Sequence, residues 1–372
     1  MHIACSINKK YIKYCSVMLQ SIINHTIKKE LFIHVLHNDL TIKDEIFLKD
    51  IFKGYPFLSF NFYKIEREKF SIFPVVADHL TVETLFRLFL AELLPNNIEK
   101  VIYIDSDIVV KEDLLNVWNI DIGKYPLAAV PNLEGVMYRV LGLKEKNDYF
   151  NAGFIVINLN KWRTEKYLEK FIKFTEGNRE KIIFGDQDIL NGVLRGDWLR
   201  LHPKWNVQNS IYSFKEDFLE YYSEECYETV SNYPAIIHYS SKLKPWNILN
   251  YQIKSEEYFH ILKKMETWED DSIYEEIDSC KNIFIFGTGE FGKKVYRAFN
   301  ICNIEIKGFI DNDSERWGNY IYNVKVYPPT EVLNEPQEKI TLLICSMYHN
   351  EILKNMQKQN YDLTNVKIIS PE

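Results

Sequence analysis

The sequence predicts an α/β protein with a mixed, mostly parallel sheet in a large N-terminal domain and a second, smaller α/β domain at the C-terminus. Two observations support this prediction. Short β-rich runs alternate with helical runs along most of the 372 residues, a pattern typical of parallel sheets covered by helices. The segment 266–278 carries seven acidic residues and no basic one, and it separates two alternating regions. We therefore expect domains at 1–265 and 281–372, joined by an acidic linker at 266–280.

The predicted elements follow one another in this alternating order. In the N-terminal domain we expect strands at 3–7, 31–36, 58–63 and 100–104 and helices at 13–23, 41–52 and 82–94. Thr41 and Asp44 fit a capping box, and Pro95 ends the third helix. In the C-terminal domain we expect strands at 283–286, 304–310, 321–327, 341–345 and 366–369 and helices at 293–300 and 350–359.

The composition is that of a globular protein, with 46% hydrophobic and 26% charged residues. The 45 basic and 52 acidic residues give a net charge of −7, which disfavours non-specific nucleic-acid binding because that mode needs an excess of Lys and Arg. The six cysteines include no Cys-x-x-Cys pair, which argues against a zinc site or a disulfide framework and for a reducing compartment. The N-terminus has no signal-peptide pattern, and no run of about 18 apolar residues occurs. We expect a cytoplasmic protein.

The predicted strand at 100–104 ends in Asp105-Ser106-Asp107. Residues two positions apart in extended chain point to the same side, so both carboxylates are expected to converge where open α/β sheets bind ligands, beyond the carboxyl ends of the strands. Two such oxygen ligands suit a divalent cation that also holds a diphosphate. The alternative is an ordinary turn, because Asp is common after strands.

Three further segments carry polar or small residues at strand and helix ends. Asn151, Ala152 and Gly153 precede an apolar strand, where the two small residues allow close approach of a ligand or simply form a turn. Asp186, with Gln187 and Asp188, opens a predicted helix; Asp186 could simply be the helix N-cap, or the three polar side chains could bind sugar hydroxyls. His238 follows a short strand and precedes Lys244; it could be a ligand or a structural histidine.

Taken together, these segments resemble glycosyltransferase family 8, the retaining GT-A-fold enzymes that use nucleotide sugars. The matching features occur in family order over about residues 1–250: Tyr11 after the first strand, Arg87, Asp-Ser-Asp, Phe-Asn-Ala-Gly, Asp-Gln-Asp and His-x-x-x-x-x-Lys-Pro-Trp. The resemblance implies a GT-A, Rossmann-like fold and an enzyme that moves galactose or glucose from a UDP-hexose to a glycan, lipid-linked or protein-linked acceptor.

The resemblance also implies roles for individual residues. It assigns the metal to Asp105, Asp107 and His238, a ligand set that favours Mn²⁺ over Mg²⁺. It assigns donor contacts to Ser6, Asn8, Tyr11, Arg87, Ser106, Asn151, Ala152 and Ser241. It places Asp186, Gln187, Asp188 and Lys244 at the catalytic centre, with Lys244 on the diphosphate. The chain departs from the family at Asn8, where Asp is frequent, and at Ser241, where Gly is usual.

The C-terminal domain carries a second candidate site. A predicted strand leads into Gly287-Thr288-Gly289-Glu290-Phe291-Gly292, and a helix follows; in this context the backbone amides at a helix N-terminus can hold a diphosphate. Asp311 lies 19 residues after Gly292, near the spacing of an acid that binds a ribose. The domain resembles the small Rossmann-like nucleotide-binding unit of some bacterial sugar acyltransferases. A second bound nucleotide and a purely structural or partner-binding role both remain open.

Two other functions remain open. The C-terminal domain could be an NAD-dependent oxidoreductase or epimerase, although it is short and lacks a Tyr-x-x-x-Lys pair, or the protein could bind sugar nucleotides without catalysis. Peripheral contact with the inner face of the cell membrane is also possible, because lysines 242, 244, 254, 263 and 264 interleave with aromatic residues 246, 251, 258 and 259. The alternative for this segment is a solvated helix with aromatics in the domain junction. The oligomeric state is not predicted.

Overall fold

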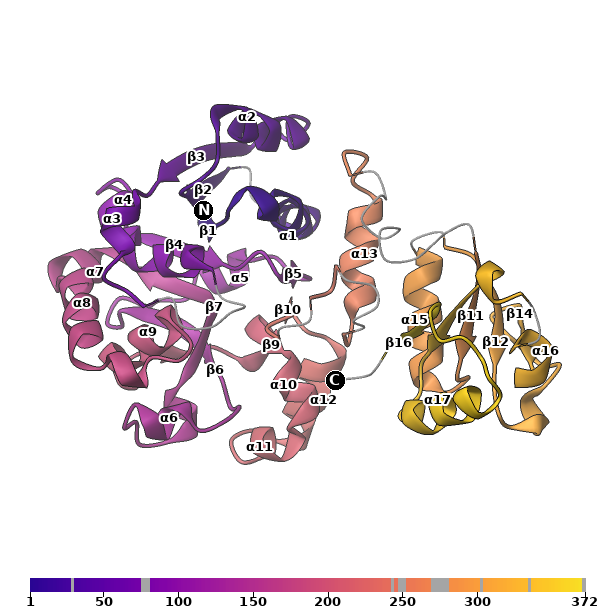
Figure 1. Ribbon diagram of the computed structural model, residues 1–372. Helices are drawn as coiled ribbons and strands as arrows, with labels where there is room; N and C mark the ends of the chain where they lie inside the picture. The colour runs from indigo at the N-terminus through magenta and orange to yellow at the C-terminus, as the bar shows by residue number, and fades with distance from the viewer. Residues whose placement is uncertain are drawn as a thin grey trace. The chain divides into compact units, whose positions relative to one another are not determined.

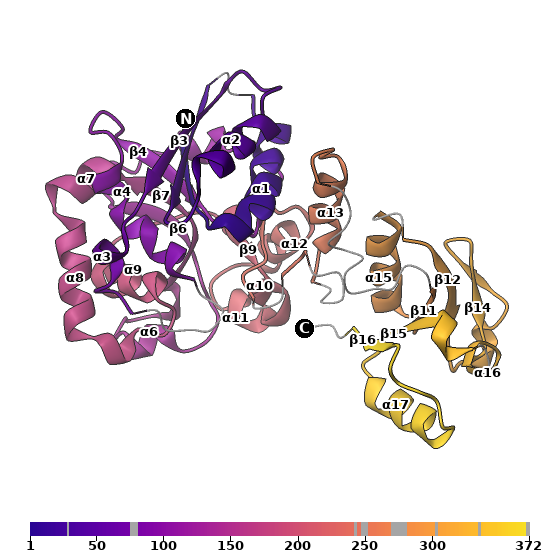
Figure 2. The ribbon, with the colours of Figure 1, turned by 45° about the horizontal axis from the view of Figure 1, so that its top comes forward.

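A seven-stranded mixed sheet forms the centre of the N-terminal part of the computed structural model (Figures 1 and 2). The structure describes residues 1–27, 30–74, 81–241, 244–246, 252–268, 281–301, 304–333 and 336–369. The strand order is β3-β2-β1-β4-β7-β6-β8, with bounds β1 His2–Ser6, β2 Leu31–His37, β3 Leu58–Lys64, β4 Lys100–Ile104, β6 Leu127–Pro131, β7 Phe150–Asn158 and β8 Leu199–Arg200. Only β7 runs antiparallel to its neighbours, β4 and β6. The predicted mixed, mostly parallel α/β fold is confirmed.

A small second sheet brings His238 to the end of β4. It has the order β5-β10-β9, with bounds β5 Ile108–Val110, β9 Val207–Gln208 and β10 Ile236–His238. Strand β10 pairs antiparallel with β5, so that His238 faces Ile108 in the ladder, and parallel with β9, so that His238 faces Gln208. Because β5 begins directly after Asp107, this pairing places a residue from position 238 beside the Asp-Ser-Asp turn.

Helices cover both faces of the large sheet (Figures 1 and 2): α1 lies on one side, and α8 and α9 lie on the other. The helices of this part are η1 Lys9–Tyr11, α1 Ile12–His25, α2 Ile42–Ile51, α3 Arg67–Phe70, η2 Val82–Phe89, α4 Leu90–Leu93, α5 Leu115–Trp118, α6 Met137–Val140, η3 Lys146–Asp148, α7 Leu159–Thr164, α8 Tyr167–Gly177, η4 Arg179–Lys181, α9 Asp186–Leu194, η5 Pro203–Asn206, α10 Asn209–Ser213, α11 Lys215–Leu219 and α12 Glu224–Asn232. The core under α7 to α9 contains the fully buried Trp162, Phe171 and Trp198.

Two predicted helices, at 41–52 and 82–94, show what the local sequence determines and what tertiary packing determines. The predicted capping box is confirmed: Asp44 N donates to Thr41 Oγ1 at 3.3 Å and Thr41 N donates to Asp44 Oδ2 at 2.9 Å. The predicted helix at 82–94 is confirmed, but it has two parts: Val82–Phe89 is a 3₁₀ helix and Leu90–Leu93 is α-helical. Six of the eight residues of η2 are buried, so their packing, more than helix propensity, sets its pitch.

The C-terminal part contains a second open sheet of order β13-β14-β12-β11-β15-β16. The elements of this part are α13 Ser255–Lys263, β11 Asn282–Phe286, α15 Glu290–Ile301, β12 Ile306–Ile310, η6 Ser314–Arg316, β13 Tyr320–Ile321, β14 Val324–Tyr327, α16 Pro329–Leu333, η7 Gln337–Lys339, β15 Ile340–Ile344, α17 His349–Lys358 and β16 Val366–Ile368. All strand pairs are parallel except β13–β14. The predicted strand 321–327 is a hairpin instead, because Tyr322 and Asn323 have φ of 50° and 66° and form a two-residue turn.

The chain divides into two compact units, Met1–Lys242 and Leu243–Glu372. Helix α13 belongs to the second unit. Most of the acidic segment expected as a linker, residues 269–280, lies outside the described residues, as do Lys242 and Tyr251, so the boundary at 266–280 stays a prediction. Tyr258 and Phe259, two of the aromatic residues expected at a membrane surface, are buried. Among the described residues, no helix has both the length and the apolar character needed to cross a bilayer.

The first unit is expected to lose stability in mild acid because of His34. This ring is 2% exposed and lies between His2 and Tyr63, with His34 Nε2 3.0 Å from His2 Nδ1 and His34 Nδ1 3.1 Å from Tyr63 Oη. Burial, followed by the charge of His2, lowers the pKa of His34 to about 4. The unfolded chain binds a proton near pH 6.5 and the folded chain does not, so stability is full above pH 6.5 and falls towards pH 4, by about 3 kcal/mol.

Urea unfolding of the first unit at pH 7.5 and pH 4.5 checks this expectation. In the His34→Gln variant the difference between the two pH values should shrink, since Gln does not titrate. An undiminished difference in that variant would assign the acid sensitivity to other groups.

Candidate active site

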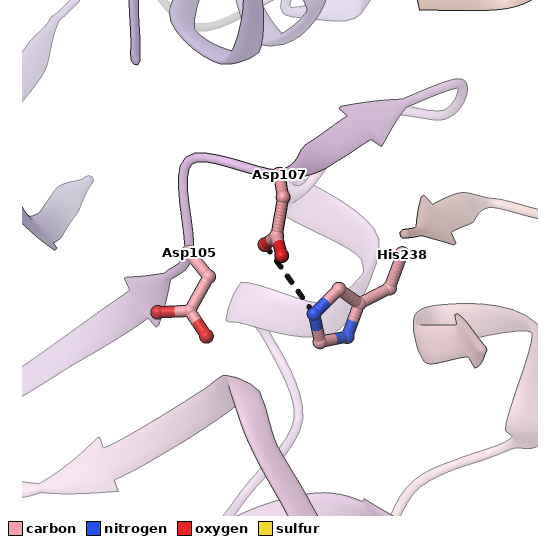
Figure 3. Close-up of side chains that lie close together, drawn as sticks. All are labelled: Asp105, Asp107 and His238. Carbon is pink, nitrogen blue, oxygen red and sulfur yellow. Dashed lines mark ion pairs between the residues drawn. The ribbon is translucent and has the colours of Figure 1, made fainter. Parts of the chain in front are cut away.

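Three side chains that the sequence predicts as metal ligands come together at the carboxyl end of β4. One ligand atom from each of Asp105, Asp107 and His238 lies within 4.8 Å of the other two. Figure 3 shows the two carboxylates pointing from the turn between β4 and β5 toward the imidazole at the end of β10. His238 Nε2 lies 3.4 Å from Asp107 Oδ1. Two carboxylates and an imidazole are a donor set that suits Mn²⁺, and this geometry fits a divalent cation.

Gly153 makes room for this cluster. A Cβ atom at this position would lie 2.2 Å from His238 Cε1 and 2.9 Å from both Asp105 Oδ2 and His238 Nε2. Asp105 Oδ2 and His238 Nε2 therefore both border the small space above the Gly153 backbone. Ala152 and Gly153 are the two small residues expected directly before an apolar strand, and the structure places both within β7.

Arg87 is a buried cation that joins the candidate metal ligands to the Asp-Gln-Asp segment. It is 2% exposed, its Nη2 lies 2.8 Å from Asp105 Oδ1, and its Nε lies 3.0 Å from Asp186 Oδ2. It also donates to the carbonyl oxygen of Ala152 and lies over the Tyr103 ring. Because Arg87 binds Oδ1 of Asp105, the other oxygen of that carboxylate is directed toward His238.

The two carboxylates beside Arg87 have raised pKa values. Burial raises the pKa of Asp186 to about 6, against the opposing effect of Arg87. Burial also raises the pKa of Asp105, again opposed by Arg87 and reinforced by Asp107. Asp186 is the first residue of α9, and the N-cap position belongs to Gly185 with φ of 55°. The interpretation of Asp186 as a helix cap is therefore wrong.

Gln187 and Asp188 have different environments. Gln187 is half-buried and accepts hydrogen bonds from Ala152 N at 3.0 Å and Asn151 Nδ2 at 3.2 Å. Asp188 is fully buried. Its oxygens accept from Tyr149 Oη at 2.7 Å and from the backbone N–H groups of Ile183 and Phe184 at 2.7 and 2.6 Å. Burial raises its pKa.

The residues expected to contact the base lie at the ends of β1 and β4, two paired strands. Asn8 Nδ2 donates to Glu83 Oε2 at 3.3 Å, and Asn8 Oδ1 is buried with no hydrogen-bond partner in the described part of the chain. Burial, with the charge of Asp107, raises the pKa of Tyr11 to about 12. Ser6 ends β1, and Ser106 is buried between the two aspartates. Ser241 follows β10 in the first unit, whereas Lys244 belongs to the second.

The glycine-rich loop of the second unit connects β11 to α15. Gly287 has φ of +118°, and a Cβ on Gly292 would lie 1.9 Å from Gly287 O, whereas the space around Gly289 is open. Asp311, after β12, accepts from Thr288 N at 3.0 Å and also from the Thr288 hydroxyl. Arg316 Nη1 donates to Thr288 Oγ1 at 2.6 Å. The strand–loop–helix context predicted from the sequence is present, and the Asp311 carboxylate already binds the loop.

Sequence reasoning missed four residues that support the site: Glu83, Tyr103, Tyr149 and Asn206. None of them belongs to a pattern that predicts chemistry by itself. Each contacts the site through pairings between elements that are distant along the chain, so no local signal identifies them.

Substitution of Gly153 by Ala is expected to disturb the metal ligands without breaking β7. The added Cβ would overlap His238 Cε1 at 2.2 Å, so the imidazole must move away from Asp105. We expect Mn²⁺ affinity to fall about 10- to 100-fold, as for other changes that misorient a ligand. Titration with Mn²⁺, followed by electron paramagnetic resonance of the free ion, measures this change. The control is Gly177→Ala, where the added methyl has open space; equal losses in both variants would contradict the prediction.

Comparison with known proteins finds relatives that match much of the chain. The chain is 26% identical over 267 residues to General stress protein A of Bacillus subtilis, covering 70% of this chain and 93% of that protein. It is 25% identical over 258 residues to lipopolysaccharide 1,2-glucosyltransferase of Escherichia coli, covering 68% of this chain and 72% of that protein. Several other curated relatives are matched over less than two thirds of their length. The crystal structure of the galactosyltransferase LgtC in complex with donor and acceptor sugar analogues superposes with a TM-score of 0.64 at 24% identity, over 74% of this chain and 99% of that one, which shows a shared fold.

Two family models match separate parts of the sequence. Residues 279–369 match the model described as C2185-like, N-terminal. Residues 2–249, which include the whole cluster around Asp105, Asp107 and His238, match the model of glycosyl transferase family 8. This second match covers most of the chain, and the chain therefore belongs to glycosyl transferase family 8.

Proposed function

We propose that this glycosyltransferase moves a hexose, galactose or glucose, from a UDP-hexose to a glycan, lipid-linked or protein-linked acceptor with retention at the anomeric carbon, in a Mn²⁺- or Mg²⁺-dependent reaction. The observation that supports this proposal most is the convergence of Asp105, Asp107 and His238 beside the buried Arg87–Asp186 pair. Relatives that act as a glucosyltransferase and a galactosyltransferase support the choice of donor.

In this proposal Asp105, Asp107 and His238 hold the metal. When bound, a divalent cation supplies Lewis-acid stabilisation of the negative charge that develops on the leaving diphosphate. Lys244 contributes a second positive charge to the diphosphate. Ser6, Asn8, Tyr11, Ser106 and Ser241 contact the nucleotide. The buried Oδ1 of Asn8, which has no partner in the described residues, is an acceptor suited to the N–H group of uracil.

The sugar is placed by the second group of residues. Asp186, held by Arg87 at 3.0 Å, and the Asn151 and Ala152 segment bind the hexose. Of Gln187 and Asp188, we place Gln187 nearer the reacting carbon, because Asp188 is fully buried. Gln is a poor nucleophile, so we propose attack by the acceptor hydroxyl on the same face from which UDP leaves, without a covalent intermediate on the chain.

Metal-stimulated release of UDP from UDP-galactose and UDP-glucose tests the proposed function. We expect turnover with one of the two donors in the presence of Mn²⁺ and none with EDTA. Binding of UDP plus Mn²⁺ without any turnover, with or without a panel of acceptor glycans, would indicate a sugar-nucleotide-binding protein. Thermal stabilisation by NAD⁺ and not by UDP plus Mn²⁺ would favour an oxidoreductase centred on the second unit.

For the second unit we propose a second nucleotide, with UDP as the first ligand to test. The open space around Gly289 leaves the backbone of the loop accessible, and the half-exposed Arg316 lies next to it. Calorimetric titration of the full chain with UDP in EDTA should show one site that an Asp107→Asn substitution does not change. Absence of this site would leave the loop with a structural or partner-binding role.

The proposed setting is the cytoplasm, with contact at the inner face of the membrane if the acceptor is lipid-linked. Co-sedimentation with anionic vesicles tests that contact. Because Tyr258 and Phe259 are buried, binding should depend on the basic side chains and weaken in high salt.

A further inference from the structure

A continuous chain of hydrogen bonds between side chains links His238 to Gln187. His238 Nδ1 lies 2.9 Å from Asn206 Oδ1, and Asn206 Nδ2 lies 2.9 Å from Asn151 Oδ1. Asn151 Nδ2 lies 3.2 Å from Gln187 Oε1. Asn206, the last residue of η5, is fully buried, and Asn151 is 7% exposed. Two amides from different elements therefore join a candidate metal ligand to the residue proposed to lie nearest the sugar.

The direction of this chain is fixed by backbone donors. Gly153 N donates to Asn151 Oδ1 at 3.0 Å, and Ala152 N donates to Gln187 Oε1 at 3.0 Å. A backbone N–H only donates, so these two side-chain atoms are oxygens and accept. Asn206 must then present its NH₂ group to Asn151, and its oxygen faces His238.

The orientation of Asn206 decides which nitrogen of His238 carries the proton. An amide oxygen only accepts, so Nδ1 of His238 must be protonated, and in the neutral ring the lone pair is on Nε2. Nε2 lies 3.4 Å from Asp107 Oδ1, so in the neutral ring its lone pair and this carboxylate can bind the same divalent cation.

We propose that Asn206 is a positioning residue that holds His238 in the Nδ1–H tautomer, so that Nε2 is available to a divalent cation, and that it ties this ligand through Asn151 to Gln187. The functional half of this inference rests on the proposed metal-dependent hexosyl transfer, whereas the tautomer follows from the hydrogen bonds alone.

The same chain continues beyond Gln187 and ends on a buried carboxylate. Gln187 Nε2 donates to Tyr149 Oη at 2.9 Å, and Tyr149 Oη donates to Asp188 Oδ1 at 2.7 Å. The other oxygen of Asp188 accepts from two backbone N–H groups, which identifies Asp188 as the final acceptor. From His238 to Asp188, each side chain donates a hydrogen bond to the next one in the series. Asp188, which is fully buried, accordingly acts through Tyr149 and Gln187, as a second positioning residue.

Nitrogen NMR of the histidine rings in the metal-free protein tests the tautomer directly. Long-range ¹H–¹⁵N spectra separate protonated from unprotonated ring nitrogens, and a His238→Gln variant assigns the signal. We expect Nδ1 of His238 to be protonated in the wild type and the tautomers to mix in Asn206→Leu. We expect Mn²⁺ binding to Asn206→Leu, measured by electron paramagnetic resonance without any sugar, to be about 10- to 100-fold weaker. A wild-type ring protonated on Nε2, or an Asn206→Leu variant with unchanged tautomer and affinity, would overturn the proposal.

A second variant separates the contact of Asn206 with His238 from its contact with Asn151. It also provides a test if Asn206→Leu does not fold. Asn206→Asp retains the acceptor for His238 and removes the donor to Asn151. The tautomer and the Mn²⁺ affinity should be retained while hexosyl turnover falls; loss of the tautomer in this variant would contradict the assigned role. The matched control is Asn158→Leu. Asn158 donates to the carbonyl oxygens of residues 122, 123 and 125 and takes no part in the hydrogen bonds between His238 and Gln187. This variant should change stability only.

These readouts also separate this inference from the proposed function. If the wild-type protein has the expected tautomer but binds no Mn²⁺, the metal site would be wrong both in the proposed function and in the role proposed for Asn206. A wild type that binds Mn²⁺ with the expected tautomer and transfers no hexose would contradict only the proposed function.

Discussion

The Asp107→Asn variant is expected to lose about 1,000-fold or more of the kcat/KM for hexosyl transfer, because Lewis-acid stabilisation at such a site is worth several kcal/mol and each 1.4 kcal/mol is about tenfold in rate. The substitution keeps the shape of the side chain and removes the charge that faces His238 Nε2 at 3.4 Å. Steady-state kinetics over a range of Mn²⁺ concentrations give the size of the effect.

The fold of this variant should be unchanged, since Asp107 lies in the turn between β4 and β5 and the substitution keeps the shape of its side chain. Equal unfolding midpoints for the wild type and the variant would confirm that the loss is chemical. Asp50→Asn, an exposed aspartate on α2, is the matched control and should transfer hexose at the wild-type rate. Wild-type turnover by Asp107→Asn in metal-depleted buffer would remove the metal from the mechanism.

The Arg87→Met variant is expected to lower the free energy of unfolding of the first unit by about 3–5 kcal/mol, the usual cost of leaving buried charges without a partner. Arg87 is 2% exposed and pairs with Asp105 at 2.8 Å and with Asp186 at 3.0 Å. Without it, the buried Asp186 and the partly buried Asp105, whose pKa values are already raised by burial, would both lose this cationic partner. Urea unfolding at pH 7 measures the loss.

The pH dependence of this loss identifies its cause. Without Arg87 the two carboxylates should bind protons in the folded state at a higher pH than in the unfolded state, so the variant should be less impaired at pH 5 than at pH 7. Adding Asp186→Asn should recover part of the stability. Arg200→Met, which removes a partly exposed partner of Asp148, is the control and should cost no more than about 1 kcal/mol. A loss that is the same at both pH values would indicate lost packing instead of unpaired charge.

The sequence alone indicated the class of fold and the identity of the three candidate metal ligands. Alternating β-rich and helical runs are a local property, and the signal at Thr41 and Asp44 is complete within four residues. The spacing of Asp105 and Asp107 places both carboxylates on one side of the chain by backbone geometry alone. The motif order then connected these positions to His238, more than a hundred residues later.

Only the tertiary structure decided how the charges and amides of the site are paired. Arg87 was predicted to contact the donor, and its partners Asp105 and Asp186 follow from the packing of η2 against α9 and against β1, the strand paired with β4. The 3₁₀ pitch of η2 likewise follows from burial on most of its sides. Asn206 carries no sequence signal, because its partners His238 and Asn151 reach it through β10 and β7. A sequence records which groups are present, but the direction of a buried hydrogen bond depends on backbone donors that only the folded chain brings into contact.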